Sequence, residues 1–424
     1  MAQEEGPWSE SQWFPANENI RRDWNQPNDF YSEEENDRRW RMQNGTWPLN
    51  ESIKEIDGEC DAWLICNLIL RRTEGRSPSA DWYDEKDNSS YHITDAPFPP
   101  PKATYQERST NYFRGTEQPL VELLDVRTWM LDNTTWSIGY GAVLKMDFIF
   151  SLQDYTPQHV TLNAIKSKLD SRRFKVPNVI RHEVQMKRKI TFETQIFGLN
   201  LGQAWLFLSS ENKERYIAAV ADFCFELSKF KGDKIGSVEG KAIQDLAIPA
   251  DGFEPPNYQK SYSPEIIHKG WATKGLESAL SEFCFSHNHC TPDNIILVDG
   301  LPVDGIPAGG DSLPAIGIVD WSAAGFVPKA WARTRFAVDM DCDLPIYHRL
   351  RKGKPSGIPV TDAHSFRWGV WKLLGNDPYN MPEVNDLWWK AHPEFAALVG
   401  PEFIQGRMSA PLSMDCNPDD FDTL

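Results

Sequence analysis

The strongest constraint on the fold is the order of apolar and helical segments that follows Pro119. Two short strands are predicted around a glycine turn in residues 136–150, and a helix is predicted in residues 159–174. A long helix in residues 209–232 opens with serine, a common capping residue. Beyond Gly325 the pattern is mostly helical. Mixed strands and helices that give way to helices favour an α+β protein with two lobes, and a cleft between lobes is a common ligand site.

The first 110 residues differ in composition from the rest, because they are acidic, rich in tryptophan and rich in turn formers. One apolar stretch, Cys60–Arg72, has helical spacing, and we predict a single amphipathic helix there. The proline-rich residues 96–104 are expected to form an extended linker. The predicted organisation is therefore an N-terminal extension (1–110), a small β-rich lobe (111–200) and a large helical lobe (201–424).

The charge of the chain limits its partners. Lysine and arginine number 44 against 61 aspartates and glutamates, which gives a net charge of −17. Such a surface repels phosphate backbones and anionic membranes, so we expect no nucleic acid and no membrane as partners. No apolar run is long enough to span a bilayer, and the first residues do not form a signal peptide. Seven cysteines without a C-x-x-C pair indicate reduced thiols, and a cytoplasmic location is expected.

Five short segments stand in a fixed order in the second half of the chain. They read FKVPNV (174–179), FGLNLGQAW (197–205), FKGDKIGSVEG (230–240), HNHCTPDNIIL (287–297), and IVDW (318–321) followed by GFVP. Together they resemble the aminoglycoside phosphotransferase and choline kinase family, particularly its fungal members, and the resemblance extends from about Trp136 to Ala337. The resemblance implies a two-lobed, protein-kinase-like fold.

The resemblance also implies a nucleotide site that binds ATP and Mg²⁺ and phosphorylates a small hydroxyl compound. Asn294 and Asp320 match the positions that hold Mg²⁺ on the phosphates, and their oxygen atoms suit this hard cation. Lys145 matches the lysine that contacts the phosphates. Gly139 and Gly141 provide a thin glycine loop for the cofactor.

Three parts of this site depart from the family pattern. His289 stands where the catalytic aspartate is expected, and no acid that could brace the lysine occurs in Thr161–Asn163. The third departure is the glycine loop, which has only Gly139 and Gly141. A positioned base contributes about 10²- to 10⁴-fold to the rate, so phosphoryl transfer is weakened. His289 could still act as a base, His287 is expected to buttress the loop, and Asp293 is a further catalytic candidate that family geometry directs elsewhere.

Three functions stay open at this stage. The first is an ATP-dependent phosphotransferase for a small metabolite, which could be cationic because Asp339, Asp341 and Asp343 are acidic. The second is a pseudokinase that binds a partner or ligand without turnover. The third is an enzyme of fungal-type metabolism with other chemistry, based on His289 or Cys290.

Several side chains also have plainer explanations. His287, His289 and Cys290 could be zinc ligands, but a kinase-type loop already explains their spacing. The three aspartates can form a solvated acidic face. A group of tryptophans near the C-terminus suits either a helical core or an aromatic cage for an ammonium group, and consists of Trp368, Trp371, Trp388 and Trp389.

Overall fold

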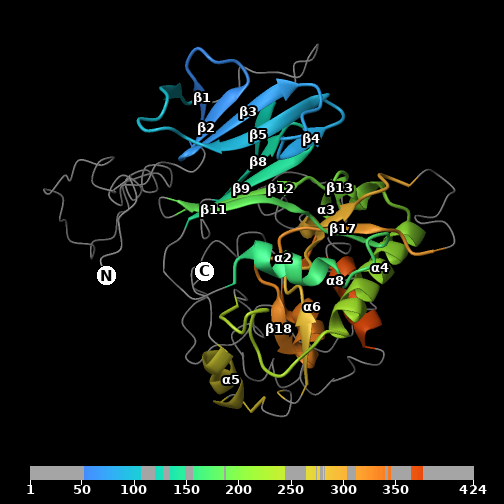
Figure 1. Ribbon diagram of the computed structural model, residues 1–424. Helices are drawn as coiled ribbons and strands as arrows, with labels where there is room; N and C mark the ends of the chain where they lie inside the picture. The colour runs from blue at the N-terminus through green and yellow to red at the C-terminus, as the bar shows by residue number, and fades with distance from the viewer. Residues whose placement is uncertain are drawn as a thin grey trace, which may run out of the picture. The chain divides into compact units, whose positions relative to one another are not determined.

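The computed structural model forms two compact units, which we describe separately (Figure 1). The first unit comprises Met1–Ser151 and Asn178–Gln195, and the second comprises Leu152–Pro177 and Ile196–Leu424. The structure describes residues 52–106, 120–127, 133–148, 156–185, 188–243, 264–273, 275–276, 280, 282–302, 312–339, 342–344 and 364–375. Among these residues, no helix combines the length and the apolar character needed to cross a membrane.

The first unit begins with a six-stranded antiparallel sheet in the order β4-β5-β3-β2-β1-β6. Its strands are β1 (Ile53–Ile56), β2 (Ala62–Ile65), β3 (Leu68–Glu74), β4 (Trp82–Asp84), β5 (Ser89–Asp95) and β6 (Ala103–Thr104). Every pairing joins strands that are close in sequence, except for β1 with β6 and β3 with β5.

The helix predicted across Cys60–Arg72 is wrong, because this stretch forms the hairpin of β2 and β3. Cys66 turns the chain with a φ of 53°. Trp63 and Leu70 are buried on one face of the sheet, while Ala62 and Ile69 are buried on the other. A strand that is buried on both faces is apolar at successive positions, and such a run cannot be distinguished from a buried helix by periodicity alone.

A second, five-stranded antiparallel sheet completes the first unit, in the order β11-β12-β9-β8-β7. Its strands are β7 (Val121–Arg127), β8 (Asn133–Ile138), β9 (Ala142–Phe148), β11 (Val179–Gln185) and β12 (Arg188–Thr194). The two strands predicted around a glycine turn are confirmed as β8 and β9. Alternation along β9 buries Leu144 and Met146 and directs Val143 and Lys145 to the opposite face.

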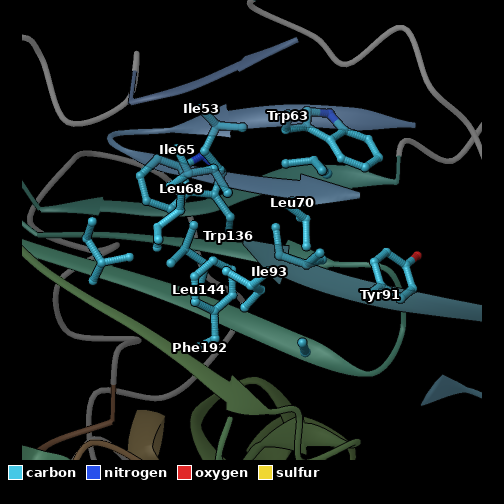
Figure 2. Packing of buried hydrophobic residues seen from close by; sticks show 14 of the residues in the cluster. Ile53, Trp63, Ile65, Leu68, Leu70, Tyr91, Ile93, Trp136, Leu144 and Phe192 are labelled. Atoms are coloured by element: carbon cyan, nitrogen blue, oxygen red, sulfur yellow. The ribbon is translucent and has the colours of Figure 1, made fainter. Parts of the chain in front are cut away.

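One hydrophobic core joins these two sheets (Figure 2). The six-stranded sheet contributes Trp63, Leu68 and Tyr91, and the five-stranded sheet contributes Trp136 and Phe192, all at most 3% exposed. The described strands of residues 53–104 therefore form one half of a core whose other half lies on the five-stranded sheet.

The second unit is largely helical. Its helices are α2 (Gln158–Lys166), α3 (Leu201–Ala204), η3 (Trp205–Phe207), α4 (Ser210–Ser228), α5 (Pro264–Thr273), α6 (Lys329–Val338) and α8 (Ser365–Leu374). Ser209 caps α4 by accepting a hydrogen bond from the amide of Asn212, which confirms the predicted start of the long helix. Helix α8 packs against both α4 and α6.

Each of the five segments that carry the family resemblance contributes a strand to one of two small sheets in the second unit. The first has the order β10-β17-β16-β13, and the second has the order β14-β15-β18. Their strands are β10 (Phe174–Lys175), β13 (Leu199–Asn200), β14 (Lys231–Gly232), β15 (Phe283–Ser286), β16 (Ile295–Leu297), β17 (Ile316–Ile318) and β18 (Gly325–Pro328). The predicted α+β class is thus confirmed, and the segments that were read as one pattern meet in space.

Candidate functional site

The loop of residues 287–294 connects β15 to β16 and contains the short helix η5 (Pro292–Asn294). His287 is 1% exposed and fixes this loop with both ring nitrogens. Its Nε2 donates to the carbonyl oxygen of Val319 at 3.1 Å, and its Nδ1 accepts from the amide of His289 at 3.3 Å. Because both nitrogens are engaged, His287 holds the loop against the segment that follows β17.

Asp320 follows β17 and has left-handed backbone geometry, with a φ of 60°. This geometry costs an ordinary residue about 1–2 kcal/mol, although aspartate and asparagine tolerate it best. The bond from the amide of Val319 to the carbonyl oxygen of Asn294, 3.1 Å long, anchors this turn to the 287–294 loop. The turn therefore places the Asp320 carboxylate beside the loop.

His289 and Asp320 form a direct pair at the centre of this site. Nδ1 of His289 lies 3.0 Å from Oδ2 of Asp320, and Oδ1 of Asp320 accepts from the hydroxyl of Ser322 at 2.7 Å. Asn294 donates from Nδ2 to the carbonyl oxygen of His289 at 3.0 Å, and the same Nδ2 lies 3.2 Å from His289 Nδ1. The structure thus brings together three of the predicted site residues, His289, Asn294 and Asp320.

The protonation of His289 follows from its partner. Burial by itself lowers the pKa of His289, but the hydrogen bond and charge of Asp320 outweigh burial, and the pKa lies above its ordinary value. Since a carboxylate can only accept, Nδ1 carries the proton in this pair. Nδ1 is therefore a donor in the resting site, and of the two ring nitrogens only Nε2 could take a proton from a substrate.

Asn294 and Asp320, the residues predicted to hold Mg²⁺, are bonded to protein groups in this arrangement. Both carboxylate oxygens of Asp320 accept hydrogen bonds from protein groups, and the amide nitrogen of Asn294 lies beside His289. Within the described part of the chain, no group of three or more histidine, cysteine, aspartate or glutamate side chains could hold a metal ion. The same finding removes support from the zinc hypothesis for His287, His289 and Cys290.

Two other candidates of this loop lie apart from the pair. Asp293 is exposed in η5, whereas its neighbour Asn294 is buried. Cys290 is buried, and its hydrogen bond to Cys224, together with burial, raises the pKa of its thiol well above the ordinary value. A thiol in that state is a poor nucleophile, so chemistry based on Cys290 has no support.

Lys145 lies in the first unit and has a partner that the sequence did not reveal. Its Nζ is 3.0 Å from Oε2 of Glu193 on the neighbouring strand β12, and the Glu193 side chain is only 2% exposed. The family pattern puts a bracing glutamate near Thr161–Asn163, where the sequence has no acid, and α2, which contains these residues, belongs to the second unit. The signal is the strand register: Thr191 pairs with Lys145, so Glu193 is its diagonal neighbour on the same face.

The predicted glycine loop forms the turn between β8 and β9. Gly139 has a φ of +60°, and a Cβ there would lie 2.6 Å from the Tyr91 hydroxyl and 2.8 Å from Asp84 Oδ2. The amide of Tyr140 donates to Asp84 Oδ2 at 2.6 Å. The turn therefore already packs against a carboxylate of the six-stranded sheet, and the glycine at 139 is required for that close approach. The role of Gly139 and Gly141 as cofactor ligands stays a prediction.

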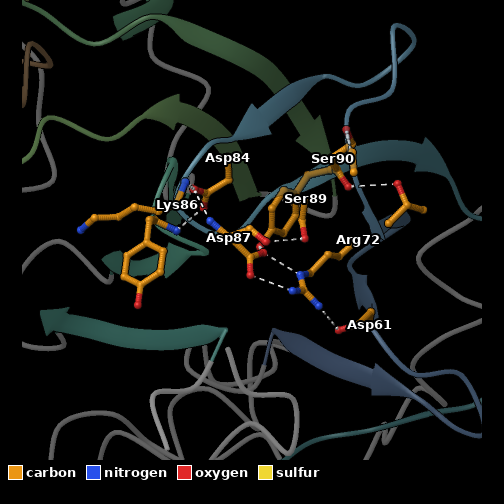
Figure 3. Close-up of polar contacts among 11 residues, drawn as sticks. Asp61, Arg72, Asp84, Lys86, Asp87, Ser89 and Ser90 are labelled. Atoms are coloured by element: carbon orange, nitrogen blue, oxygen red, sulfur yellow. Dashed lines mark hydrogen bonds and ion pairs between the residues drawn. The ribbon is translucent and has the colours of Figure 1, made fainter. Parts of the chain in front are cut away.

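Asp84 belongs to a polar cluster at the end of that sheet (Figure 3). Its Oδ1 accepts from the amides of Lys86 and Asp87 at 3.0 and 3.3 Å. Arg72 binds Asp87 through two nitrogens at 2.6 and 2.7 Å and also reaches Asp61 at 3.2 Å. This cluster fixes the loop between β4 and β5, which in turn holds the β8–β9 turn.

The acidic residues after the Asp-Trp motif are balanced by arginines. Asp339 pairs with Arg335 at 2.7 Å, and Asp343 pairs with Arg367, which is fully buried. Asp341 lies outside the described residues. Attraction of a cationic substrate therefore has no support from the two aspartates that are described.

The tryptophans of α8 pack with one another and with an arginine. The rings of Trp368 and Trp371 are 5.3 Å apart, edge to face, and the guanidinium of Arg333 lies 4.3 Å from the Trp371 ring centroid. Trp388 and Trp389 lie outside the described residues. Arg333 thus already supplies a cation to Trp371.

No family model and no curated protein matches this chain. Solved structures similar to it include a thermostable mutant of aminoglycoside phosphotransferase APH(4)-Ia in a ternary complex with ADP and hygromycin B, at 13% identity over 68% of this chain and 95% of the other, with a TM-score of 0.32. They also include the GDP complex of wild-type aminoglycoside 2'-phosphotransferase-IIIa, at 14% identity over 65% and 92%, with a TM-score of 0.32.

Proposed function

We propose that this protein is a nucleotide-binding relative of the kinase-like small-molecule phosphotransferases that does not transfer the phosphoryl group. The observation that carries this proposal is the 3.0 Å contact between His289 Nδ1 and Asp320 Oδ2. Phosphoryl transfer in such folds needs an acceptor for the substrate's hydroxyl proton and a metal on the phosphates. The pair weakens both, because the Asp320 carboxylate already accepts two hydrogen bonds from the protein and the Nδ1 of His289 is already a donor, which leaves only Nε2 of that ring as a proton acceptor.

Support for retained nucleotide binding comes from Lys145. An ammonium group that is held by a buried carboxylate loses less freedom when it binds a phosphate, and the Lys145–Glu193 pair provides such support. Solved complexes with ADP and GDP are named among the similar structures, which agrees with a nucleotide as ligand. The proposed partner is thus a small molecule, an ATP-type nucleotide.

The test is thermal unfolding of the full chain with and without ADP. Ligand at 100 times its dissociation constant stabilises the folded state by about 2.7 kcal/mol, which shifts the midpoint measurably. We expect a shift in the wild type that Lys145→Ala abolishes. The matched control is Lys189→Ala, which removes the same charge from the same face of the same sheet and should keep the shift.

A second measurement tests the absence of turnover. We expect no ADP formation from ATP above background when the wild type is mixed with a panel of small hydroxyl compounds. Acceptor-dependent ADP formation that disappears in His289→Ala would contradict the proposal. It would instead support an active phosphotransferase for a hydroxyl-bearing metabolite, the second candidate, which the intact Lys145–Glu193 pair favours.

A further inference from the structure

The partner of Asp320 in this site is a side chain of the protein itself. His289 Nδ1 and the Ser322 hydroxyl each take one carboxylate oxygen, at 3.0 and 2.7 Å. Both donors come from residues that the local backbone fixes: His289 is tied to His287 through its amide, and Ser322 is only two residues from Asp320. Each carboxylate oxygen of Asp320 therefore already accepts one hydrogen bond from the protein before any ligand arrives.

We propose that this protein binds its nucleotide without a divalent cation, because the N–H of His289 faces the Asp320 oxygen that a metal ion would bind. This inference rests on the proposed function for the identity of the ligand. The exclusion of the metal rests only on the contacts of His289, Asn294 and Asp320.

A divalent cation demands a particular set of ligands. Mg²⁺ binds oxygen atoms at about 2.0–2.1 Å in nearly octahedral geometry. At Asp320 it would have to share Oδ2 with the His289 N–H or Oδ1 with the Ser322 hydroxyl. The His289 N–H directs its positive end toward Oδ2 and would lie beside a cation bound there, and Asn294 also presents its amide nitrogen to this region. Both nitrogen donors therefore oppose a cation beside Asp320.

His289 is the residue that would exclude the divalent cation. Replacement of His289 by aspartate removes the donor and adds a carboxylate beside Asp320 and Asn294. Three oxygen-bearing side chains would then surround one position, which is the ligand chemistry of Mg²⁺ and Mn²⁺ sites.

The decisive experiment titrates Mn²⁺ alone into the full chain and follows free Mn²⁺ by electron paramagnetic resonance. We expect no saturable site in the wild type. His289→Asp should gain one site, whose affinity for Mn²⁺ is at least about tenfold above the unsaturable binding of the wild type. The double variant His289→Asp/Asp320→Asn should lose that site. A saturable Mn²⁺ site in the wild type that Asp320→Asn removes would overturn the inference. So would a folded His289→Asp variant, checked by circular dichroism, that gains no site.

A parallel measurement separates this inference from the proposed function. The ADP-induced thermal shift of the wild type should be the same in EDTA and in Mn²⁺. A shift that appears only with Mn²⁺ would overturn metal-free binding, while leaving nucleotide binding intact. The absence of any shift would overturn the proposed function, and the Mn²⁺ titration would still decide the metal question by itself.

Discussion

At the residue scale, the chemistry of this protein is set by partners that sequence spacing cannot show. The resemblance correctly brought His289, Asn294 and Asp320 to one place, because β16 and β17 are read directly from apolar runs beside the motifs. It could not reveal that His289 is bonded to Asp320, since a hydrogen bond between side chains depends on rotamers and on the left-handed turn at Asp320. Glu193 was missed because the expected brace was sought on a helix.

Glu193 offers the first test at this scale. Glu193→Gln removes the negative charge beside Lys145 with little change in shape, and the freed ammonium should bind phosphate less well. We expect the dissociation constant for ADP to rise by roughly tenfold, the equivalent of one charge-assisted hydrogen bond. Isothermal titration calorimetry measures this change. Glu183→Gln, on the adjacent strand β11, is the control and should leave the affinity unchanged; an equal loss in both variants would contradict the positioning role of Glu193.

Gly139 offers a second test. Gly139→Ala would place a methyl group 2.6 Å from the Tyr91 hydroxyl at a φ of +60°. Gly75→Ala is the matched control, because Gly75 has a φ of +82° but nothing within 4 Å of the added carbon. The control should lose about 1–2 kcal/mol from the backbone conformation alone, and Gly139→Ala about 1–3 kcal/mol more from overpacking. Urea unfolding gives both values, and equal losses would argue against a tightly packed turn.

At the element scale, β8, β9 and the long helix α4 were predicted, whereas the hairpin of β2 and β3 was not. Residues 60–72 were read as a helix because apolar residues follow one another without a two-residue alternation. The reason is that β2 and β3 are covered on both faces, by the cluster containing Trp63 and by that containing Ile69. Burial on two faces is a tertiary property, so only the structure could settle it.

Arg72 tests how β3 is fixed to the loop between β4 and β5. Arg72→Met would leave the Asp87 carboxylate, only 2% exposed, without its bidentate partner, and a loss of about 3–5 kcal/mol is expected. The neighbouring Arg71 pairs with Glu59, but both side chains are more than 40% exposed. Arg71→Met should therefore cost less than about 1 kcal/mol. Chemical denaturation distinguishes the two, and similar losses would show that the cluster in Figure 3 is not a buried network.

At the scale of the whole molecule, the strands of residues 53–104 and the five-stranded sheet of the first unit share one core. A chain that begins at residue 111 would lack all six strands β1–β6 and would expose Trp136, Leu144 and Phe192 to water. We expect it to aggregate or to lose cooperative unfolding, as measured by light scattering and calorimetry. A deletion of residues 1–51 keeps every described strand of the first unit and is the control. A cooperative unfolding transition in the chain that begins at residue 111 would contradict the shared core.

The ion pair between Lys145 and Glu193 has a consequence for control of the protein. Where the partner of such a lysine sits on a helix, moving the helix can break the pair and switch ligand binding off. Here both residues belong to adjacent strands of one sheet, β9 and β12, and α2 belongs to the other unit. The pair is therefore made once, when the sheet folds, and a displaced helix has no means of releasing it. Occupancy of this lysine would then follow the supply of ligand rather than a signal passed through the fold.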